Sequence, residues 1–429
     1  MNKSYQTSNQ WLTRAQKTIP LGSQTFSKSH IAYPKDVSPM FIKRGLGCQV
    51  WDADENQYTD FVSGLLSVSL GYCNSSIDDA VIEQIKSGVT FSLPHQLEME
   101  VAEKLVELIP CAEMVRFGKN GSDATSAAIR LARAFTNKEH VAVCGYHGWQ
   151  DWYIGSTTRD LGVPKSTKGL THQFTYNDIS SLEQIFTNQE NQVAAVILEP
   201  MNVAFPTDNF LHKVQALCKK HGAVLIFDET ITGFRYHLGG AQTLFGVTPD
   251  LATFGKGMAN GYPISAVVGR RDIMMLMEDI FFSGTFAGET LSLAAAKATI
   301  EFMETHNVVA HLSTMGKKLQ AGLATQIADL QAEAWLSLAG HPAWSFLTIG
   351  PQSDYSAIQL KSLFLQEMAA RGFLLGGGHN LNYAHKTADI DELLSAYQAV
   401  LPILANTIKN KDFDSVFKGK LLEPVFKVR

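Results

Sequence analysis

Residues 192–230, QVAAVILEPMNVAFPTDNFLHKVQALCKKHGAVLIFDET, contain two short apolar runs separated by a helical pattern. Apolar runs without alternating polar residues indicate strands that are buried on both faces, as in a parallel sheet covered by helices. The intervening NFLHKVQALCKKHG, residues 209–222, is typical of a crossover helix that ends at a glycine. The stretch therefore predicts a strand–helix–strand unit of an α/β domain.

Similar apolar runs at 140–146 and 264–270 predict further strands of the same sheet. LEMEVAEKLVELI, residues 97–109, has apolar residues at helical spacing and predicts an amphipathic helix. We expect one large α/β domain over residues 65–310.

The two ends of the chain have a different pattern. IKRGLGCQVWDADENQYTDFV, residues 42–62, alternates apolar and polar residues around the turn signal DADEN and predicts a hairpin. AWSFLTIG, residues 343–350, is strand-like and is followed by helical LKSLFLQEMAARG. We expect a smaller α+β domain formed by residues 1–64 and 311–429.

The composition is that of an ordinary soluble globular protein, with 45% hydrophobic and 18% charged residues. A net charge of −5 gives no sign of a nucleic-acid-binding face. No apolar run approaches the roughly 20 residues of a membrane span, and the N-terminus lacks the apolar segment of a signal peptide. The five scattered cysteines form no C-x-x-C pair, which favours reduced thiols over disulfides or a metal site. We expect a cytoplasmic protein with no nucleic-acid, membrane or metal partner.

GKNGSDATSAAIRLAR, residues 118–133, places Gly121 and Ser122 directly before a helical pattern. Free amides at a helix start, together with the positive end of the helix dipole, form an anion site. The alternative is a plain cap, in which Ser122 or Asp123 binds the helix's own amides. The glycines fit neither a P-loop nor a dinucleotide fingerprint.

Two charged residues follow apolar strands. Asp228 ends AVLIFD, and carboxylates at the carboxyl ends of parallel strands face the ligand crevice of open α/β sheets. Lys256 stands between two glycines in FGKGMANGYP, residues 254–263, which leaves room for a ligand beside its amine. In the alternative readings, Asp228 caps the next segment, and Lys256 is solvated or pairs with Asp228.

CGYHGW, residues 144–149, places three aromatic residues just past another strand. Tyr146 or Trp149 could stack on a flat ligand or simply pack, and we expect His147 to pack or to hydrogen-bond rather than to act as an acid or base. An anion site, a carboxylate, an aromatic face and an uncrowded lysine together point to pyridoxal phosphate.

At these residues the sequence resembles the class III pyridoxal-phosphate aminotransferases, in the branch that contains glutamate-1-semialdehyde aminomutase. The resemblance covers nearly the whole chain and implies the fold-type I fold, with a mostly parallel seven-stranded sheet in the large domain. It also implies a homodimer with shared active sites. The motifs that carry it occur in the family's order: IPLGSQTFSKSH, MFIKRGLGCQVWDADENQYTDFVSG, NGSDATSAAIRLAR, YHGW, ILEP, FDETITGFR, PDLATFGKGMANGYP, SGTFAGETLSLAAA and AHKTADIDELL.

The resemblance implies a role for each matching position around the cofactor. Lys256 corresponds to the lysine that forms the Schiff base, and Asp228 to the partner of the pyridine nitrogen. Gly121 and Ser122 correspond to phosphate-binding residues, and Tyr146 to the residue that stacks on the ring.

Three further cofactor contacts are implied in the same way. Thr285 should reach the phosphate of the neighbouring subunit, and Glu199 matches an acidic residue near the cofactor. Thr230 stands where the family has an apolar β-branched residue, and its methyl can pack against the ring.

The candidates for substrate contacts are Trp149, Arg235, His379 and Asn380. Arg235 could pair bidentately with the donor carboxylate, or equally form a structural ion pair. His379 and Asn380 offer neutral donors and acceptors that suit hydroxyls.

One departure from the family concerns the reaction. Where the aminomutase has a glutamate, this sequence has only glycine, at Gly376–Gly378, which argues against the mutase reaction and leaves room for a longer substrate. We therefore expect a transaminase with an amino-acid donor, L-glutamate, and a sugar-type oxo acceptor, 3,8-dideoxy-8-oxo-manno-octulosonate. The alternatives are an aminomutase-type isomerase and another nucleotide-sugar or ω-amino transaminase. A nicotinamide dehydrogenase would leave Lys256 unexplained, and a cofactor-binding regulator would need a basic DNA-binding appendage.

Overall fold

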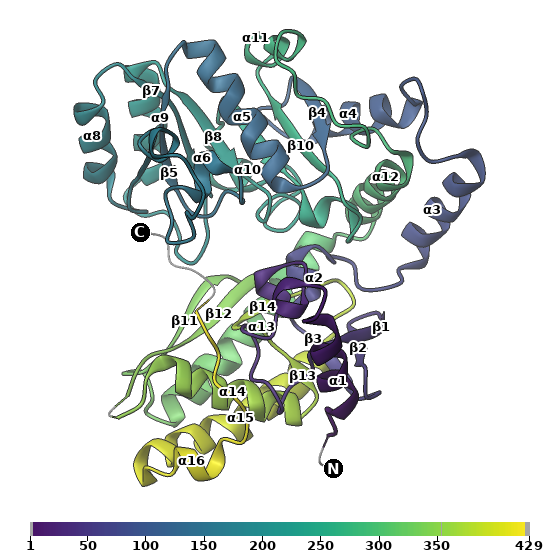
Figure 1. Cartoon of the computed structure of the whole chain (residues 1–429), viewed down its shortest axis with the longest axis vertical. Helices are drawn as coiled ribbons and strands as arrows, with labels where there is room; N and C mark the ends of the chain where they lie inside the picture. Colours follow the sequence, from purple (N-terminus) through teal and green to yellow (C-terminus); the bar gives the residue numbers. More distant parts are fainter. Residues whose placement is uncertain (1–2, 353, 425–429) are drawn as a thin grey trace. The chain divides into compact units, whose positions relative to one another are not determined.

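The computed structural model describes residues 3–352 and 354–424 (Figure 1). The chain divides into two compact units. One combines the residues up to Asn74 with Ala310 and the residues that follow, and the other spans Ser75–Val309. The boundaries predicted from the sequence, after residues 64 and 310, stay a prediction.

The larger unit contains a seven-stranded sheet in the order β4-β10-β9-β8-β7-β5-β6. Strand β10 runs antiparallel to both of its neighbours, and the other pairs are parallel. The predicted fold class, with its mostly parallel seven-stranded sheet, is confirmed. The strands are β4 (Met114–Gly118), β5 (His140–Cys144), β6 (Thr171–Gln173), β7 (Val193–Leu198), β8 (Val224–Asp228), β9 (Leu251–Phe254) and β10 (Ser265–Gly269).

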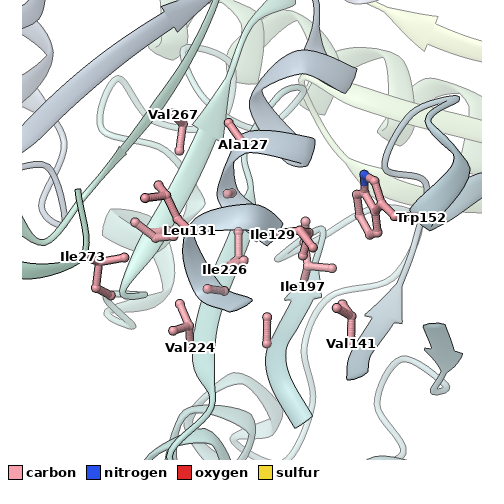
Figure 2. Packing of buried hydrophobic residues seen from close by; sticks show 14 of the residues in the cluster. Ala127, Ile129, Leu131, Val141, Trp152, Ile197, Val224, Ile226, Val267 and Ile273 are labelled. Carbon is pink, nitrogen blue, oxygen red and sulfur yellow. The ribbon is translucent and has the colours of Figure 1, made fainter. Parts of the chain in front are cut away.

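The central strands are buried because helices of this unit pack on the sheet. Every residue of β7, β8, β9 and β10 is buried. Figure 2 shows α5 (Gly121–Thr136) crossing the strands, with Ile129 and Leu131 packed among Ile197 and Ile226. The predicted crossover helix is α9 (Phe210–His221), which ends at Gly222 in the left-handed conformation.

The remaining α-helices of this unit come before, between and after the strands in the sequence. Among the described residues of the whole chain, no helix is both long enough and apolar enough to cross a membrane. The α-helices are α3 (Ser75–Ser87), α4 (Gln96–Leu108), α6 (Asp151–Ile154), α7 (Lys165–Lys168), α8 (Ile179–Asn188), α10 (Ala241–Phe245), α11 (Arg271–Met274) and α12 (Thr290–Thr305).

The smaller unit holds a four-stranded sheet, β1-β2-β3-β13, and a three-stranded sheet, β11-β12-β14. The predicted hairpin is confirmed by the antiparallel β2–β3 pair, whose turn is fixed by Asp52 accepting from the amides of Asp54 and Asn56. The strands are β1 (Ile42–Leu46), β2 (Gln49–Asp52), β3 (Gln57–Asp60), β11 (Leu336–His341), β12 (Trp344–Ile349), β13 (Phe373–Leu374) and β14 (Gly378–Asn380). The helices are α1 (Gln6–Ala15), α2 (Ser63–Leu66), α13 (Val308–Asp329, beginning just before the boundary), α14 (Ala357–Ala370), α15 (Thr387–Asn410) and α16 (Phe413–Val416).

Candidate active site

The carboxyl ends of the parallel strands in the larger unit meet at one edge of the sheet. Cys144 of β5 pairs in register with Leu198 of β7, and Asp228 of β8 pairs with Thr253 of β9. The residues that follow these strands are therefore neighbours, although they are far apart in the sequence.

Asp228 is buried and held by three hydrogen bonds. Its Oδ1 accepts from the Thr230 amide and the Thr253 hydroxyl, both at 3.1 Å. Its Oδ2 lies 2.9 Å from Nδ1 of His147. Burial alone would raise the pKa of Asp228, but the hydrogen bond and charge of His147 and the bond from the Thr230 amide outweigh it, so the pKa lies below its usual value.

His147 faces an acceptor oxygen with each ring nitrogen. Nε2 lies 3.1 Å from the carbonyl oxygen of Cys144, and Nδ1 faces the Asp228 carboxylate. Both neighbouring oxygen atoms can accept a hydrogen bond from the ring. The hydrogen-bonding role predicted for His147 is confirmed, and its effect is to keep Asp228 ionised.

Lys256 follows β9 and begins a short 3₁₀ turn. Its φ of 42° lies in the left-handed region that non-glycine residues rarely adopt, so its placement is strained. Burial lowers the pKa of its amine, against the opposing charges of Glu199 and Asp228. Within residues 3–352 and 354–424 its amine has no hydrogen bond or ion pair, so the alternative of a Lys256–Asp228 ion pair is not observed. A half-buried amine with a lowered pKa is a competent nucleophile.

The start of α5 is open to an anion. Asp123 Oδ2 accepts from the amides of Lys119 and Asn120, both at 3.0 Å. This carboxylate therefore binds amides that precede the helix and leaves the first amides of the helix itself free among the described residues. Ser122 Oγ accepts from the Trp149 amide at 3.2 Å. The amides of Gly121 and Ser122 have no partner in the described part of the chain. The alternative of a plain cap therefore accounts for Asp123 but leaves these two donors unused.

Glu199 and Tyr146 meet at the ends of β7 and β5. Glu199 Oε2 accepts from the Tyr146 amide at 3.3 Å and from Asn202 at 2.7 Å. Burial, together with the charge of Asp228, raises the pKa of Glu199. The Tyr146 ring is half-exposed and makes an edge contact with Tyr153, with ring centroids 5.6 Å apart.

The other predicted residues are more dispersed. Trp149 is exposed beside Tyr146, and Thr285 is exposed in the loop before α12. Arg235 is buried in the larger unit, and burial lowers its pKa to about 10. Their predicted roles stay predictions.

His379 and Asn380 lie on β14 of the smaller unit. His379 binds Ser345 through Nδ1 at 2.9 Å and Tyr397 through Nε2 at 2.6 Å, so both of its ring nitrogens are occupied. Asn380 donates its side-chain amide to the carbonyl oxygen of Val62 at 2.8 Å. These bonds hold both side chains within the smaller unit, and their contact with substrate hydroxyls stays a prediction.

Two residues that sequence reasoning missed complete the site. Thr253 holds Asp228 from the neighbouring strand, and Asn202 holds Glu199. Thr253 lies inside an apolar run, and only the strand register shows that it faces Asp228.

Comparisons with known proteins agree with this geometry. The family model described as aminotransferase class-III matches residues 31–333. The 3-aminobutyryl-CoA aminotransferase of Cloacimonas acidaminovorans (strain Evry) is 34% identical over 403 residues, covering 92% of this chain and 96% of that protein. A glutamate-1-semialdehyde 2,1-aminomutase of Syntrophobacter fumaroxidans is 34% identical over 386 residues, covering 84% and 89%.

A solved structure shows the same architecture. The pyridoxal-phosphate internal aldimine form of the FumI protein of Sphingopyxis sp. MTA144 superposes with a TM-score of 0.87 at 29% identity, covering 96% of this chain and 98% of that chain. The family match, the relatives and this structure confirm the predicted cofactor, pyridoxal phosphate, and the predicted class of enzyme, a transaminase. The chain belongs to the class III aminotransferase family.

Proposed function

We propose that this enzyme transfers an amino group from L-glutamate to the oxo group of 3,8-dideoxy-8-oxo-manno-octulosonate, as an 8-amino-3,8-dideoxy-manno-octulosonate transaminase of lipopolysaccharide biosynthesis. The residues near the sheet edge support the transamination chemistry. Residues of the smaller unit support an acceptor that is a sugar acid.

The observation that carries the acceptor proposal is at Gly376–Gly378, between β13 and β14. No acidic residue occurs in this stretch, where the resemblance places the aminomutase glutamate. Lys361 of α14 approaches instead, and a Cβ atom at Gly377 would lie 2.8 Å from its Nζ. Burial lowers the pKa of Lys361, and its amine has no ion-pair partner among the described residues. A lysine amine beside bare glycine backbone favours an acceptor that carries a carboxylate.

The residues of the larger unit fit pyridoxal phosphate. The free amides of Gly121 and Ser122 suit the phosphate, because a helix start attracts anions. Asp228 Oδ2 has one hydrogen bond and can accept a second from a protonated ring nitrogen. The Lys256 amine is unpaired in the described part of the chain and suits the aldehyde.

When bound, the cofactor supplies an aldehyde that carries the amino group and a ring that accepts electrons. The Lys256 amine would hold the aldehyde and, once freed by the donor, would take the proton from the donor's α-carbon and carry it as an ammonium. Asp228 keeps the ring nitrogen protonated through a charge-assisted hydrogen bond. His147 and Thr253 hold that carboxylate in place.

The acceptor is tested with a panel of aldehydes and L-glutamate, by following 2-oxoglutarate release. We expect the highest kcat/KM for the octulosonate aldehyde and much lower values for neutral aldehydes of the same length. The same panel includes glutamate 1-semialdehyde without a donor. Its efficient isomerisation to 5-aminolevulinate would overturn the transaminase proposal in favour of the mutase alternative.

We also propose that the chain forms a homodimer. Helices α3 and α4 of the larger unit expose apolar side chains, among them Ile82, Ile85 and Met99, each more than half exposed. The loop that carries Thr285 also exposes Phe281 and Phe286. Such apolar surface is typical of a protein–protein interface. Light scattering after gel filtration should give twice the chain mass of 47.1 kDa, and a monomeric mass would contradict the shared-site proposal.

A further inference from the structure

Two hydroxyl groups near Lys256 are buried without a hydrogen-bond partner among the described residues, Thr230 Oγ1 and Ser265 Oγ. Both side chains border Gly255, the residue before Lys256. A Cβ atom at Gly255 would lie 3.5 Å from Thr230 Cγ2 and 3.7 Å from Ser265 Cβ. Native proteins leave few buried hydroxyls unpaired, so each of these calls for an explanation.

The two hydroxyls differ in their surroundings. Ser265 is fully buried on β10, opposite Gly118 of β4, and a Cβ atom at Gly118 would lie 3.0 Å from its Oγ. Thr230 is only partly buried and lies beside the first residue of α5. A Cβ atom at Gly121 would lie 3.5 Å from Thr230 Oγ1. Only Thr230 therefore adjoins the helix start with its free amides.

The backbone of Thr230 is fixed by the same carboxylate that the cofactor needs. Its amide donates to Asp228 Oδ1 at 3.1 Å, and the Thr253 hydroxyl donates to the same oxygen. Thr230 is therefore held beside Gly121, the first residue of α5. Its hydroxyl and the amides of Gly121 and Ser122 are three donors at this helix start without a partner in the described chain.

We propose that the Thr230 hydroxyl donates a hydrogen bond to a phosphate oxygen of pyridoxal phosphate, as a third donor beside the amides of Gly121 and Ser122. Phosphate oxygens are strong acceptors and bind best where several donors are preorganised. The sequence predicted only that the methyl of Thr230 packs against the ring. The proposal rests on the cofactor and does not depend on which acceptor the enzyme uses.

The test compares Thr230→Val, which keeps the branched shape and removes the hydroxyl, with Thr230→Ser, which keeps the hydroxyl. The dissociation constants of pyridoxal phosphate and of pyridoxal, which lacks the phosphate, are measured by absorbance titration of each apoenzyme. We expect Thr230→Val to weaken binding of pyridoxal phosphate roughly tenfold to a hundredfold, as for a hydrogen bond to a charged group. Binding of pyridoxal should not change, and Thr230→Ser should behave as the wild type.

Ser265→Ala is the matched control, because it removes the other unpaired hydroxyl from an enclosed position. It should leave both dissociation constants unchanged, and circular dichroism should show each variant folded. Three results would overturn the proposal. Thr230→Val could bind pyridoxal phosphate as tightly as the wild type, or lose as much affinity for pyridoxal as for pyridoxal phosphate. Ser265→Ala could also lose as much affinity for pyridoxal phosphate as Thr230→Val. Wild-type protein that binds neither compound would instead refute the cofactor assignment, and the proposal with it.

Discussion

The bond between His147 and Asp228 gives a quantitative prediction. Asp228 accepts three hydrogen bonds, and the one from His147 is the only one whose donor can carry a charge. A hydrogen bond to a charged group contributes about 1.5–3 kcal/mol to stability. If the His147 bond stabilises the transition state by this full amount, His147→Phe should lower kcat roughly 10- to 150-fold. Thr253→Val removes a neutral donor from the same carboxylate and should lower kcat by about 10-fold, the lower end of that range.

The effect of His147→Phe on the stability of the apoenzyme should depend on pH. The folded-state pKa of Asp228 is depressed, so its ionised form stabilises the folded chain above the ordinary aspartate pKa of about 4, and this stabilisation is lost as pH falls through the depressed value. Without His147, burial raises the pKa of Asp228. The apoenzyme of His147→Phe should therefore be less stable than the wild type at neutral pH, and the difference should shrink towards acid pH.

Two assays check these expectations. Single-turnover absorbance with L-glutamate measures the donor half-reaction, and urea unfolding followed by circular dichroism measures apoenzyme stability at neutral and acid pH. His147→Gln keeps one amide donor and should fall between the wild type and His147→Phe. A larger rate loss in Thr253→Val than in His147→Phe, or a stability difference that does not vary with pH, would refute the assigned order of these bonds.

Three further changes test other parts of the site. Lys256→Ala should abolish turnover with every donor yet still bind the cofactor non-covalently, as seen by absorbance, and normal turnover would exclude its amine as the reacting group. Lys361→Met should raise the KM of a carboxylate-bearing acceptor about tenfold or more by removing a charged contact, without slowing the glutamate half-reaction. Lys317→Met, at an exposed lysine, is its control. If the two variants had the same KM for the acceptor, Lys361 would not contact the acceptor. Gly145→Ala should cost about 1–3 kcal/mol in urea unfolding, because φ is 108° and its Cβ would lie 2.5 Å from Glu199 Oε2. Gly162→Ala, at a φ of 88° with open space around it, should cost less, and equal losses would show that backbone strain alone is responsible.

The fold could be predicted where a continuous stretch of sequence is apolar throughout and is therefore buried. The apolar runs at 192–200 and 222–230 became β7 and β8 because every position of these strands is buried. The crossover helix between them was equally clear from its periodicity and its terminal glycine. The antiparallel insertion of β10 between β4 and β9 was not predicted, because its pairing with β4 joins segments more than a hundred residues apart. The short connection between β9 and β10 fits their antiparallel pairing, since a parallel pair needs a longer crossover.

For single side chains of the site, too, contacts between distant parts of the sequence could not be predicted. Asp228 and Lys256 could be singled out because each directly follows a strand. The pairing of His147 with Asp228 could not be deduced, because the two are 81 positions apart and meet only through the strand order. His379 and Asn380 show what the chemistry of a side chain leaves open. Both suit a substrate, yet they bind Ser345, Tyr397 and Val62 inside the smaller unit, which their sequence positions did not indicate.

The polar groups of the site fall into two classes with different roles. The Asp228 carboxylate is held by hydrogen bonds from His147, Thr253 and Thr230, which orient it before any ligand binds. The donors at the helix start and the Lys256 amine are unpaired in the described part of the chain, and Lys256 also has a strained backbone. A folded protein tolerates such groups only when other contacts over-determine them. Cofactor binding should satisfy these groups and stabilise the folded state in proportion to cofactor concentration. Mutating the residues that hold Asp228 should therefore affect catalysis and apoenzyme stability together, whereas mutating the unpaired groups should affect cofactor affinity and leave the apoenzyme as stable or more so.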